Sequence, residues 1–122
     1  MKKVEAIIRP DRLQAVQDAL DVLGGSGLTI TEVLGCGQQR GYTETYRGTR
    51  ANISLQRKVK VEAIVPDSVV DAVVAAIAGA ARTGEIGDGK IFVLPVEDAV
   101  RVRTGERGEG IVSHRELEHW GH

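Results

Sequence analysis

The sequence Val-Glu-Ala-Ile-Ile at residues 4–8 recurs almost unchanged as Val-Glu-Ala-Ile-Val at residues 61–65. Both stretches are rich in β-branched residues and alternate in a way that is typical of a strand with one buried face. The repetition predicts two strands with equivalent places in the fold.

The same helix signal follows each of these strands. A Pro-Asp pair and then apolar residues at helical spacing occupy residues 10–23 in the first copy and 66–77 in the second. Proline and aspartate are favoured where a helix begins, and glycine where it ends. The pattern predicts two helices that are ended by Gly24 and Gly84. Arg9 is the one residue that has no counterpart in the second copy.

Further strand patterns complete the predicted order. They occupy residues 28–35, residues 90–96 and a short V-R-V-R-T stretch at residues 100–104. The order is strand, helix, strand, strand, helix, strand, with a small terminal strand. On one sheet this is the α+β, ferredoxin-like βαββαβ arrangement, with a long loop between strands 2 and 3.

One face of the predicted sheet has the apolar side chains that the two helices would cover. It comprises Val4, Ala6, Ile8, Val59, Val61, Ala63 and Val65. The opposite face would carry Ile7 and Ile64 among lysines and glutamates. A face of that mixture, with no helix to cover it, suggests burial against another subunit, so we expect an oligomer.

The composition restricts the class of protein. The chain has 122 residues, enough for one domain, and a formal net charge of −1, which argues against a general electrostatic grip on nucleic acid. Phe92 is the one aromatic residue on a predicted strand, so base stacking on the sheet is also disfavoured. Cys36 cannot form an internal disulfide and is expected to be a small buried residue. No apolar run approaches the roughly 20 residues of a membrane-spanning helix, and no secretory signal is present, so we predict a cytoplasmic protein.

Residues 37–56 interrupt the periodic pattern. This stretch of about 20 residues is rich in Gly, Thr, Gln and Arg. Loops of that length are uncommon in compact domains unless they have a function. We therefore interpret residues 37–56 as a functional loop rather than a plain hairpin connection.

The stretch Gly84–Lys90 resembles the start of a Walker A loop, but its context differs. It follows a predicted helix and opens a strand, and Ile91 stands where that loop needs a hydroxyl for magnesium. The glycines still let backbone N–H groups approach phosphate oxygens, with the charge of Lys90 beside them. Arg101 and Arg103, on one face of the predicted terminal strand, add two guanidinium groups suited to a polyphosphate. Together these residues favour anion binding.

Signatures of an enzyme are sparse. No Ser/His/Asp pattern is present, and all three histidines lie within the last nine residues. We interpret residues 109–122 as a flexible C-terminal tail that follows a single domain at residues 1–108. The sequence therefore predicts a protein that is not an enzyme.

The longer motifs resemble the PII nitrogen-regulatory signal-transduction proteins. They are T-G-E-I-G-D-G-K-I-F-V at residues 83–93, V-R-V-R-T-G-E-R-G at residues 100–108, the opening K-K-V-E-A-I-I-R-P, and T-E-x-Y-R-G at residues 43–48. The resemblance implies a homotrimer with nucleotide sites in the clefts between subunits. ATP and ADP would compete there, and magnesium-ATP would permit binding of 2-oxoglutarate. The loop 37–56 would then dock on a target, either an ammonium transporter or another membrane transporter, or a metabolic enzyme.

The resemblance also implies roles for individual residues. Those at the nucleotide would be Thr29, Gly37, Gln38, Glu62, Ile64, Gly87, Asp88, Gly89, Lys90, Arg101 and Arg103. Those at 2-oxoglutarate would be Gln39, Arg40, Gly41, Lys58 and Gly87. Gln39 would also ligate magnesium, and Lys58 would pair with the distal carboxylate of 2-oxoglutarate. Partner contacts would come from Arg47, Thr49 and Arg50.

Several positions depart from the family pattern. Gln38 replaces an arginine that would face the terminal phosphate of ATP, which predicts a weaker preference for ATP. Ala51 stands at the position of the modified tyrosine, so uridylylation is impossible there. Two alternatives stay open: a PII-like sensor of another small anion or of a metal, with the histidine tail taking part, and a slow ATPase that uses the same cleft.

Overall fold

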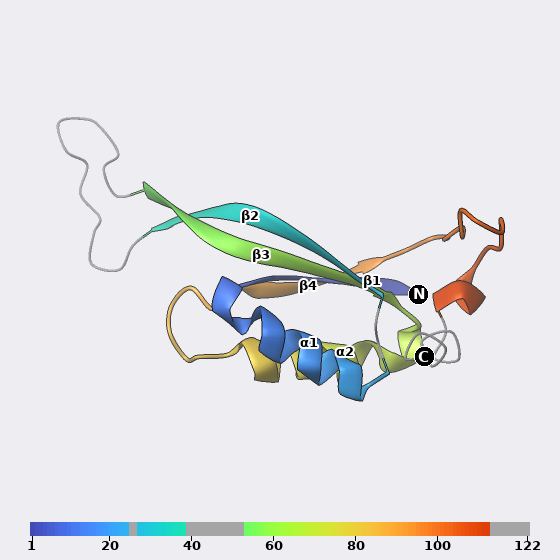
Figure 1. The fold of residues 1–122 in the computed structure, drawn as a ribbon, viewed down its shortest axis with the longest axis horizontal. Coiled ribbons are helices and arrows are strands. Elements are labelled where there is room, and N and C mark those ends of the chain that lie inside the picture. Colours follow the sequence, from blue (N-terminus) through green and yellow to red (C-terminus); the bar gives the residue numbers. More distant parts are fainter. Residues whose placement is uncertain (25–26, 39–52, 113–122) are drawn as a thin grey trace.

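The computed structural model describes residues 1–24, 27–38 and 53–112. Four strands form one sheet and two helices lie against one of its faces (Figure 1). The strands are β1 (Lys2–Ile8), β2 (Leu28–Gln38), β3 (Ile53–Val65) and β4 (Lys90–Pro95). The helices are α1 (Leu13–Val22) and α2 (Val70–Ala81). Short 3-10 turns occupy Pro10–Arg12, Asp67–Val69 and Glu109–Val112.

The sheet has the strand order β2-β3-β1-β4, and all neighbouring strands are antiparallel. This confirms the predicted ferredoxin-like arrangement. The two copies of the repeat lie side by side in the centre of the sheet, so that Val4 pairs with Ala63 and Ala6 with Val61. Glu5 consequently lies opposite Glu62, a like-charge pair that would be unfavourable alone.

Lys3 relieves this like-charge contact. Its Nζ atom lies 3.0 Å from Glu62 Oε2 and 3.3 Å from Glu5 Oε1. The hydrogen bonds to Glu62 and then to Glu5 raise the pKa of Lys3 above its ordinary value. Lys3 thus forms ion pairs with both glutamates of the repeat, on the sheet face that the helices do not cover.

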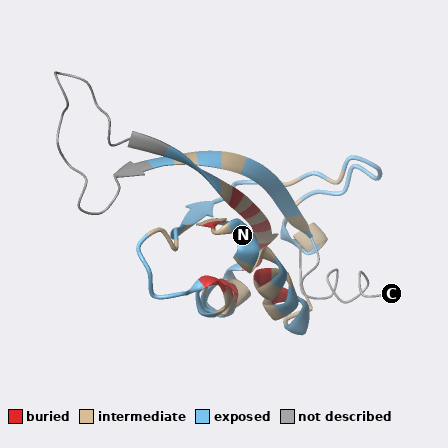
Figure 2. Cartoon of the chain, turned by 60° about the vertical axis from the view of Figure 1, so that its left-hand side comes forward, coloured by how far each residue is buried: buried red, intermediate tan, exposed pale blue. Residues whose placement is uncertain are grey.

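The core lies between the sheet and the helices (Figure 2). All seven strand residues predicted to face the helices are buried, and the helices add Val16, Leu20, Val73, Ile77 and Ala81. Each Pro-Asp pair lies at the 3-10 turn that leads into a helix, as the sequence predicts. Arg12 ties the helices together, because its Nε and Nη2 atoms donate to the Ala80 carbonyl at 3.0 and 2.7 Å.

Three boundaries differ from the predictions. Helix α2 ends at Ala81 because Arg82 is already extended, so Gly84 lies in the loop beyond it; Gly24 does follow the end of α1. The strands beside the predicted loop are longer than expected, since β2 runs to Gln38 and β3 begins at Ile53. Residues 100–104 form a turn with an isolated bridge instead of a strand.

Beyond the helices, β2 and β3 continue as a two-stranded ribbon that leaves the body of the molecule (Figure 1). Leu34, Cys36 and Leu55 lie on this part, and all three are exposed. The prediction that Cys36 is buried is therefore wrong, because no helix extends beneath the ribbon at that point. Among the described residues, no helix is long and apolar enough to cross a membrane.

Candidate functional site

The glycine-rich loop at residues 83–89 joins α2 to β4 and passes the end of β1. Gly87 and Gly89 have φ angles of 100° and 103°, a backbone region that favours glycine. A Cβ atom at residue 89 would lie 1.7 Å from the Ile7 carbonyl oxygen. Only glycine fits there, because the loop backbone runs directly against the backbone of β1.

Asp88 organises this loop from within. Its Oδ2 atom accepts hydrogen bonds from the backbone N–H groups of Thr83 and Gly84, both at 2.9 Å. Its Oδ1 atom accepts from the Thr83 hydroxyl and from Arg9 Nε. These donors, the Thr83 hydroxyl first, hold the pKa of Asp88 well below its usual range. The carboxylate that the resemblance assigns to the ligand thus accepts hydrogen bonds from the loop itself and from Arg9.

Two cations bind successive carbonyl groups of the loop. Arg9 Nη2 donates to the Ile86 carbonyl at 2.7 Å, and Lys58 Nζ donates to the Gly87 carbonyl. Arg9 was not among the predicted site residues. The signal that could have found it is its place as the extra residue between the first strand and Pro10.

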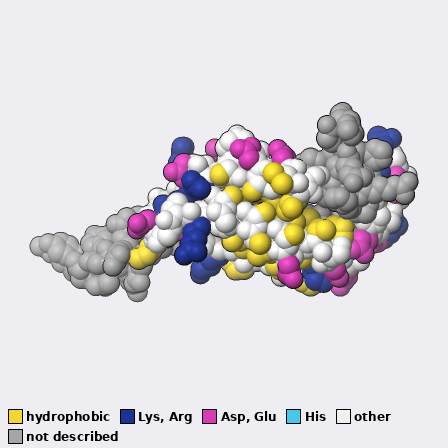
Figure 3. Space-filling model, turned by 90° about the horizontal axis from the view of Figure 1, so that it is seen from below, with side chains coloured by type: hydrophobic (Ala, Val, Ile, Leu, Met, Phe, Trp, Pro, Cys, Tyr) yellow, Lys and Arg dark blue, Asp and Glu magenta, His cyan; other side chains and the backbone are white. Residues whose placement is uncertain are grey.

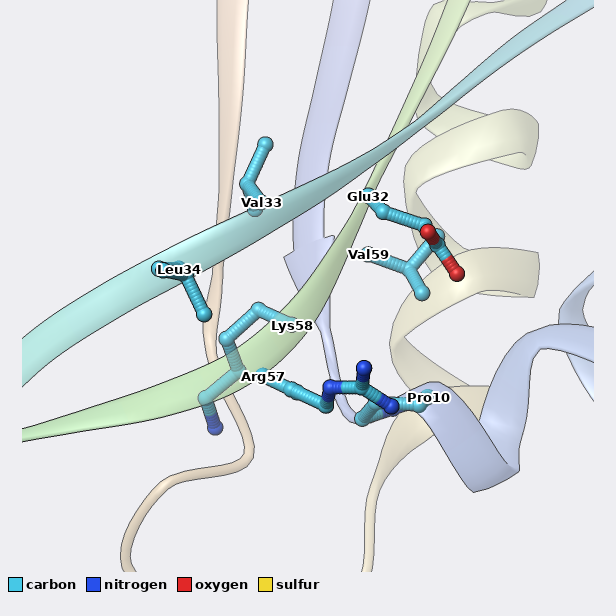
Figure 4. A pocket seen from close by; sticks show the side chains of 7 residues that line it. All are labelled: Pro10, Glu32, Val33, Leu34, Arg57, Lys58 and Val59. Atoms are coloured by element: carbon cyan, nitrogen blue, oxygen red, sulfur yellow. The ribbon is translucent and has the colours of Figure 1, made fainter.

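Lys and Arg side chains gather where the ribbon leaves the body (Figure 3). Beside this region lies a depression of about 260 Å³, lined by Pro10, Glu32, Val33, Leu34, Arg57, Lys58 and Val59. Arg57 extends toward Pro10, whereas Lys58 leaves β3 on the other side, as expected for adjacent strand residues (Figure 4). The surface beside the glycine-rich loop is therefore rich in positive charge.

Thr29, Glu62 and Ile64 lie together on the uncovered face of the sheet. Thr29 pairs with Glu62 across β2 and β3, and Ile64 is two residues further along β3. Glu62 is four residues from Lys58, which is roughly 13 Å along a strand. The structure thus places these three residues together but separates them from the glycine-rich loop.

Arg101 and Arg103 lie in the segment after β4, at the end of the molecule opposite the glycine-rich loop (Figure 1). The prediction that they share one face of a strand is wrong, because residues 102–104 form a turn. Arg101 Nη1 lies 2.9 Å from Glu106 Oε1. A single chain therefore does not bring the arginine pair to the loop.

Comparison with known proteins identifies the family. The family model for nitrogen regulatory protein P-II matches residues 1–106. The chain belongs to the P-II family. It is 53% identical over 112 residues to the P-II protein of Cereibacter sphaeroides, covering 92% of this chain and all of the relative. It is 57% identical over 107 residues to that of Microchaete diplosiphon, covering 88% and 96%.

The fold of a solved P-II structure agrees with this assignment. The crystal structure of Arabidopsis thaliana PII bound to citrate has a TM-score of 0.74 and 48% sequence identity, and the match covers 89% of each chain. The P-II family is one of regulatory proteins, which agrees with the function class expected from the motifs.

Of the predicted site residues, Gly37 and Gln38 are described in their backbone, and several others lie outside the described part of the chain. The backbone of Gly37 and Gln38 forms the last two pairs of the ribbon, opposite Ser54 and Ile53. Other predicted residues lie outside the described part of the chain: Gln39, Arg40, Gly41, Arg47, Thr49, Arg50 and the three histidines. Within the described residues, no group of three His, Cys, Asp or Glu side chains could hold a metal ion.

Proposed function

We propose that this P-II protein is a homotrimeric sensor that binds ATP or ADP between its subunits and regulates a target protein. The observation that carries the proposal is the glycine cradle at residues 87–89, where Gly87 and Gly89 have no Cβ atom and Arg9 braces Asp88 between them. Such a cradle lets N–H groups approach phosphate oxygens. Lys90 follows it directly as the first residue of β4 and adds positive charge.

The need for a second copy of the chain is supported by where the arginines lie. The segment after β4, which contains Arg101 and Arg103, is at the opposite end of the subunit from the loop that holds the cradle (Figure 1). In a ring of three copies, the arginines of one subunit would meet the cradle of its neighbour. Thr29, Glu62 and Ile64 on the uncovered sheet face would then lie beside the adenine base.

Lys58 supports a second, dianionic ligand such as 2-oxoglutarate. Its ammonium group donates to the neutral Gly87 carbonyl, and a carboxylate would be a stronger acceptor for the same donor. Binding would therefore exchange a loop contact for a ligand contact at the base of the ribbon. Because Lys58 lies on β3, which leads to the segment at residues 39–52, this exchange would let ligand binding influence that segment.

Magnesium would be held by phosphate oxygens of ATP and by Gln39. The nearby carboxylate of Asp88 is engaged by Thr83, Gly84 and Arg9, so it is not a free metal ligand. The metal would supply positive charge that offsets the phosphates and the carboxylates of 2-oxoglutarate.

The target would be a membrane transporter, for ammonium or another solute, or a metabolic enzyme. It would be contacted through the segment that joins β2 to β3, which contains Arg47, Thr49 and Arg50. Ala51 lacks a hydroxyl, so the ligand state would be the signal and uridylylation at that position would have no part. Regulation, rather than catalysis, is the activity proposed for this site.

Calorimetry of the purified protein with ATP and ADP, each with and without Mg²⁺ and 2-oxoglutarate, tests the proposal. We expect nucleotide binding with one site per subunit and a trimer in sedimentation analysis. If neither ATP nor ADP bound, the proposal would be overturned. A response to 2-oxoglutarate that is lost in Lys58→Gln but kept in Lys60→Gln, its neighbour on the same face, would assign that ligand to Lys58.

A further inference from the structure

The segment after β4 folds back on itself as a closed hairpin. Val100 bridges Arg107, and Arg101 N donates to the Glu106 carbonyl at 2.8 Å. Gly105 N donates to the Arg101 carbonyl at 2.7 Å, and Gly105 has a φ angle of 77°. The hairpin therefore presents its side chains from a fixed backbone.

A carboxylate inside this hairpin binds one of the two predicted phosphate arginines. Glu106 Oε1 accepts from Arg101 Nη1 at 2.9 Å and from the Thr104 hydroxyl at 2.9 Å. The Glu106 N–H donates in turn to the Thr104 hydroxyl at 3.2 Å. Glu106 is thus held in place by its own turn, with its carboxylate directed at Arg101.

The shape of the hairpin does not depend on Glu106 alone. Arg107 forms an ion pair with Asp98 through its Nε atom at 3.0 Å, and the Arg107 contact lowers the pKa of Asp98. Gly108 N donates to the Ala99 carbonyl at 2.9 Å. A substitution that removes only the charge of Glu106 therefore leaves these other contacts in place.

We propose that Glu106 is an internal competitor of the nucleotide phosphates for Arg101. This inference rests on the proposed function, since it takes Arg101 as a phosphate ligand. Carboxylate and phosphate oxygens are the same class of acceptor for a guanidinium group. A phosphate that approaches Arg101 must share it with Glu106 or displace that carboxylate, and the negative charge of Glu106 repels the phosphate in either case.

The competition sets both affinity and selectivity. It lowers the affinity for every nucleotide, and it lowers it more for ATP than for ADP because ATP carries more negative charge. Glu106 thereby lowers the ratio of ATP affinity to ADP affinity. It acts through Arg101, without being a nucleotide ligand itself.

The test is calorimetry of the full chain with ATP and with ADP, using Glu106→Gln. Glutamine keeps an oxygen acceptor for Arg101 and the Thr104 hydroxyl but removes the charge. We expect ATP to bind about two- to fivefold more tightly, the range that an exposed ion pair supports. The gain for ADP should be smaller. Glu109→Gln is the matched control, because it removes the same charge from the residues that directly follow the hairpin.

Two further variants separate competition from a merely structural role. Glu106→Asp retains the charge and should keep the wild-type ratio of ATP to ADP affinity. In an Arg101→Gln background, adding Glu106→Gln should no longer tighten ATP binding, because the coupling passes through Arg101. Unchanged or weaker ATP binding by Glu106→Gln would overturn the inference while the proposed function stands. A wild-type chain that binds no nucleotide would overturn both.

Discussion

Arg9 Nε lies 3.0 Å from Asp88 Oδ1, so the residue that directly follows β1 braces the loop that precedes β4. The same guanidinium group reaches the Ile86 carbonyl through Nη2. A planar fork with several donors can hold both acceptors at once, which a lysine ammonium group cannot do in the same geometry. The shape of the glycine-rich loop is thus set from outside the loop as well as from inside it.

Arg9→Lys should therefore weaken nucleotide binding although the positive charge remains. We expect a loss of about three- to tenfold in affinity, the net contribution of one ordinary hydrogen bond. Calorimetry with ADP measures it. Arg12→Lys is the control, because Arg12 contacts the Ala80 carbonyl between the helices and not the loop. Equal losses in the two variants would contradict a specific role for Arg9.

Gly89→Ala and Gly84→Ala separate steric clash from backbone strain. Both positions have a φ angle near 90–103°, so alanine costs about 1–2 kcal/mol at either. At residue 84 the new Cβ meets nothing within 4 Å, whereas at residue 89 it would meet the Ile7 carbonyl. Urea unfolding should show a clearly larger destabilisation for Gly89→Ala, and nucleotide binding should be lost in that variant alone. Similar unfolding curves for the two would contradict the close approach to β1.

Because the pKa of Asp88 is lowered in the folded state, the difference in unfolding free energy between wild type and Asp88→Asn should depend on pH. A carboxyl group whose pKa is depressed in the folded state stabilises that state above its unfolded value, near 3.9, and loses this effect as the pH falls toward the folded value. Wild type should therefore exceed Asp88→Asn in unfolding free energy from pH 7 to about pH 5. The difference should shrink below about pH 4. Denaturant unfolding across this range measures it, and a difference that is constant with pH would refute the role assigned to the carboxylate.

Gln38→Arg should restore a preference for ATP. An arginine at the last residue of β2 would return the charge-assisted hydrogen bond that the family pattern places at the terminal phosphate, worth about 1–3 kcal/mol. Gln56→Arg adds the same charge elsewhere on the ribbon and should leave the ratio of ATP to ADP affinity unchanged. Equal tightening of ATP and ADP in Gln38→Arg would mean that residue 38 does not read the terminal phosphate.

The core of the fold was predictable because its signals are local. Alternation in β1 and β3 identified Val4, Ala6 and Val61 as buried, and the repeat identified two equivalent strand-helix units. Cys36 was mispredicted because residue type says little about burial where a strand outruns the helices that cover it. The alternation of residues 100–104 is that of a strand, but Gly105 and the contacts of Glu106 close a turn there.

The glycine-rich loop was predictable in its residue types and less so in its contacts. Gly87 and Gly89 were named from the glycine-rich pattern, and their backbone geometry agrees with a cradle. Arg9 was missed because its contact with Asp88 spans 79 residues of sequence, which no local pattern reports. The role of Asp88 within the loop required the positions of its donors.

The register between β2 and β3 fixes both the direction of the Lys58 side chain and the two ends of the segment that joins these strands. Lys58 reaches the Gly87 carbonyl only in the observed register, since a slip of one residue would turn its side chain to the other face. The same register holds Gln38 beside Ile53, so the two ends of the intervening segment are fixed neighbours. That segment can be exchanged for one of another length or sequence while its two anchor points stay where they are. If the segment contacts the target as proposed, the body of the molecule would stay the same and a new insert alone would change the target specificity.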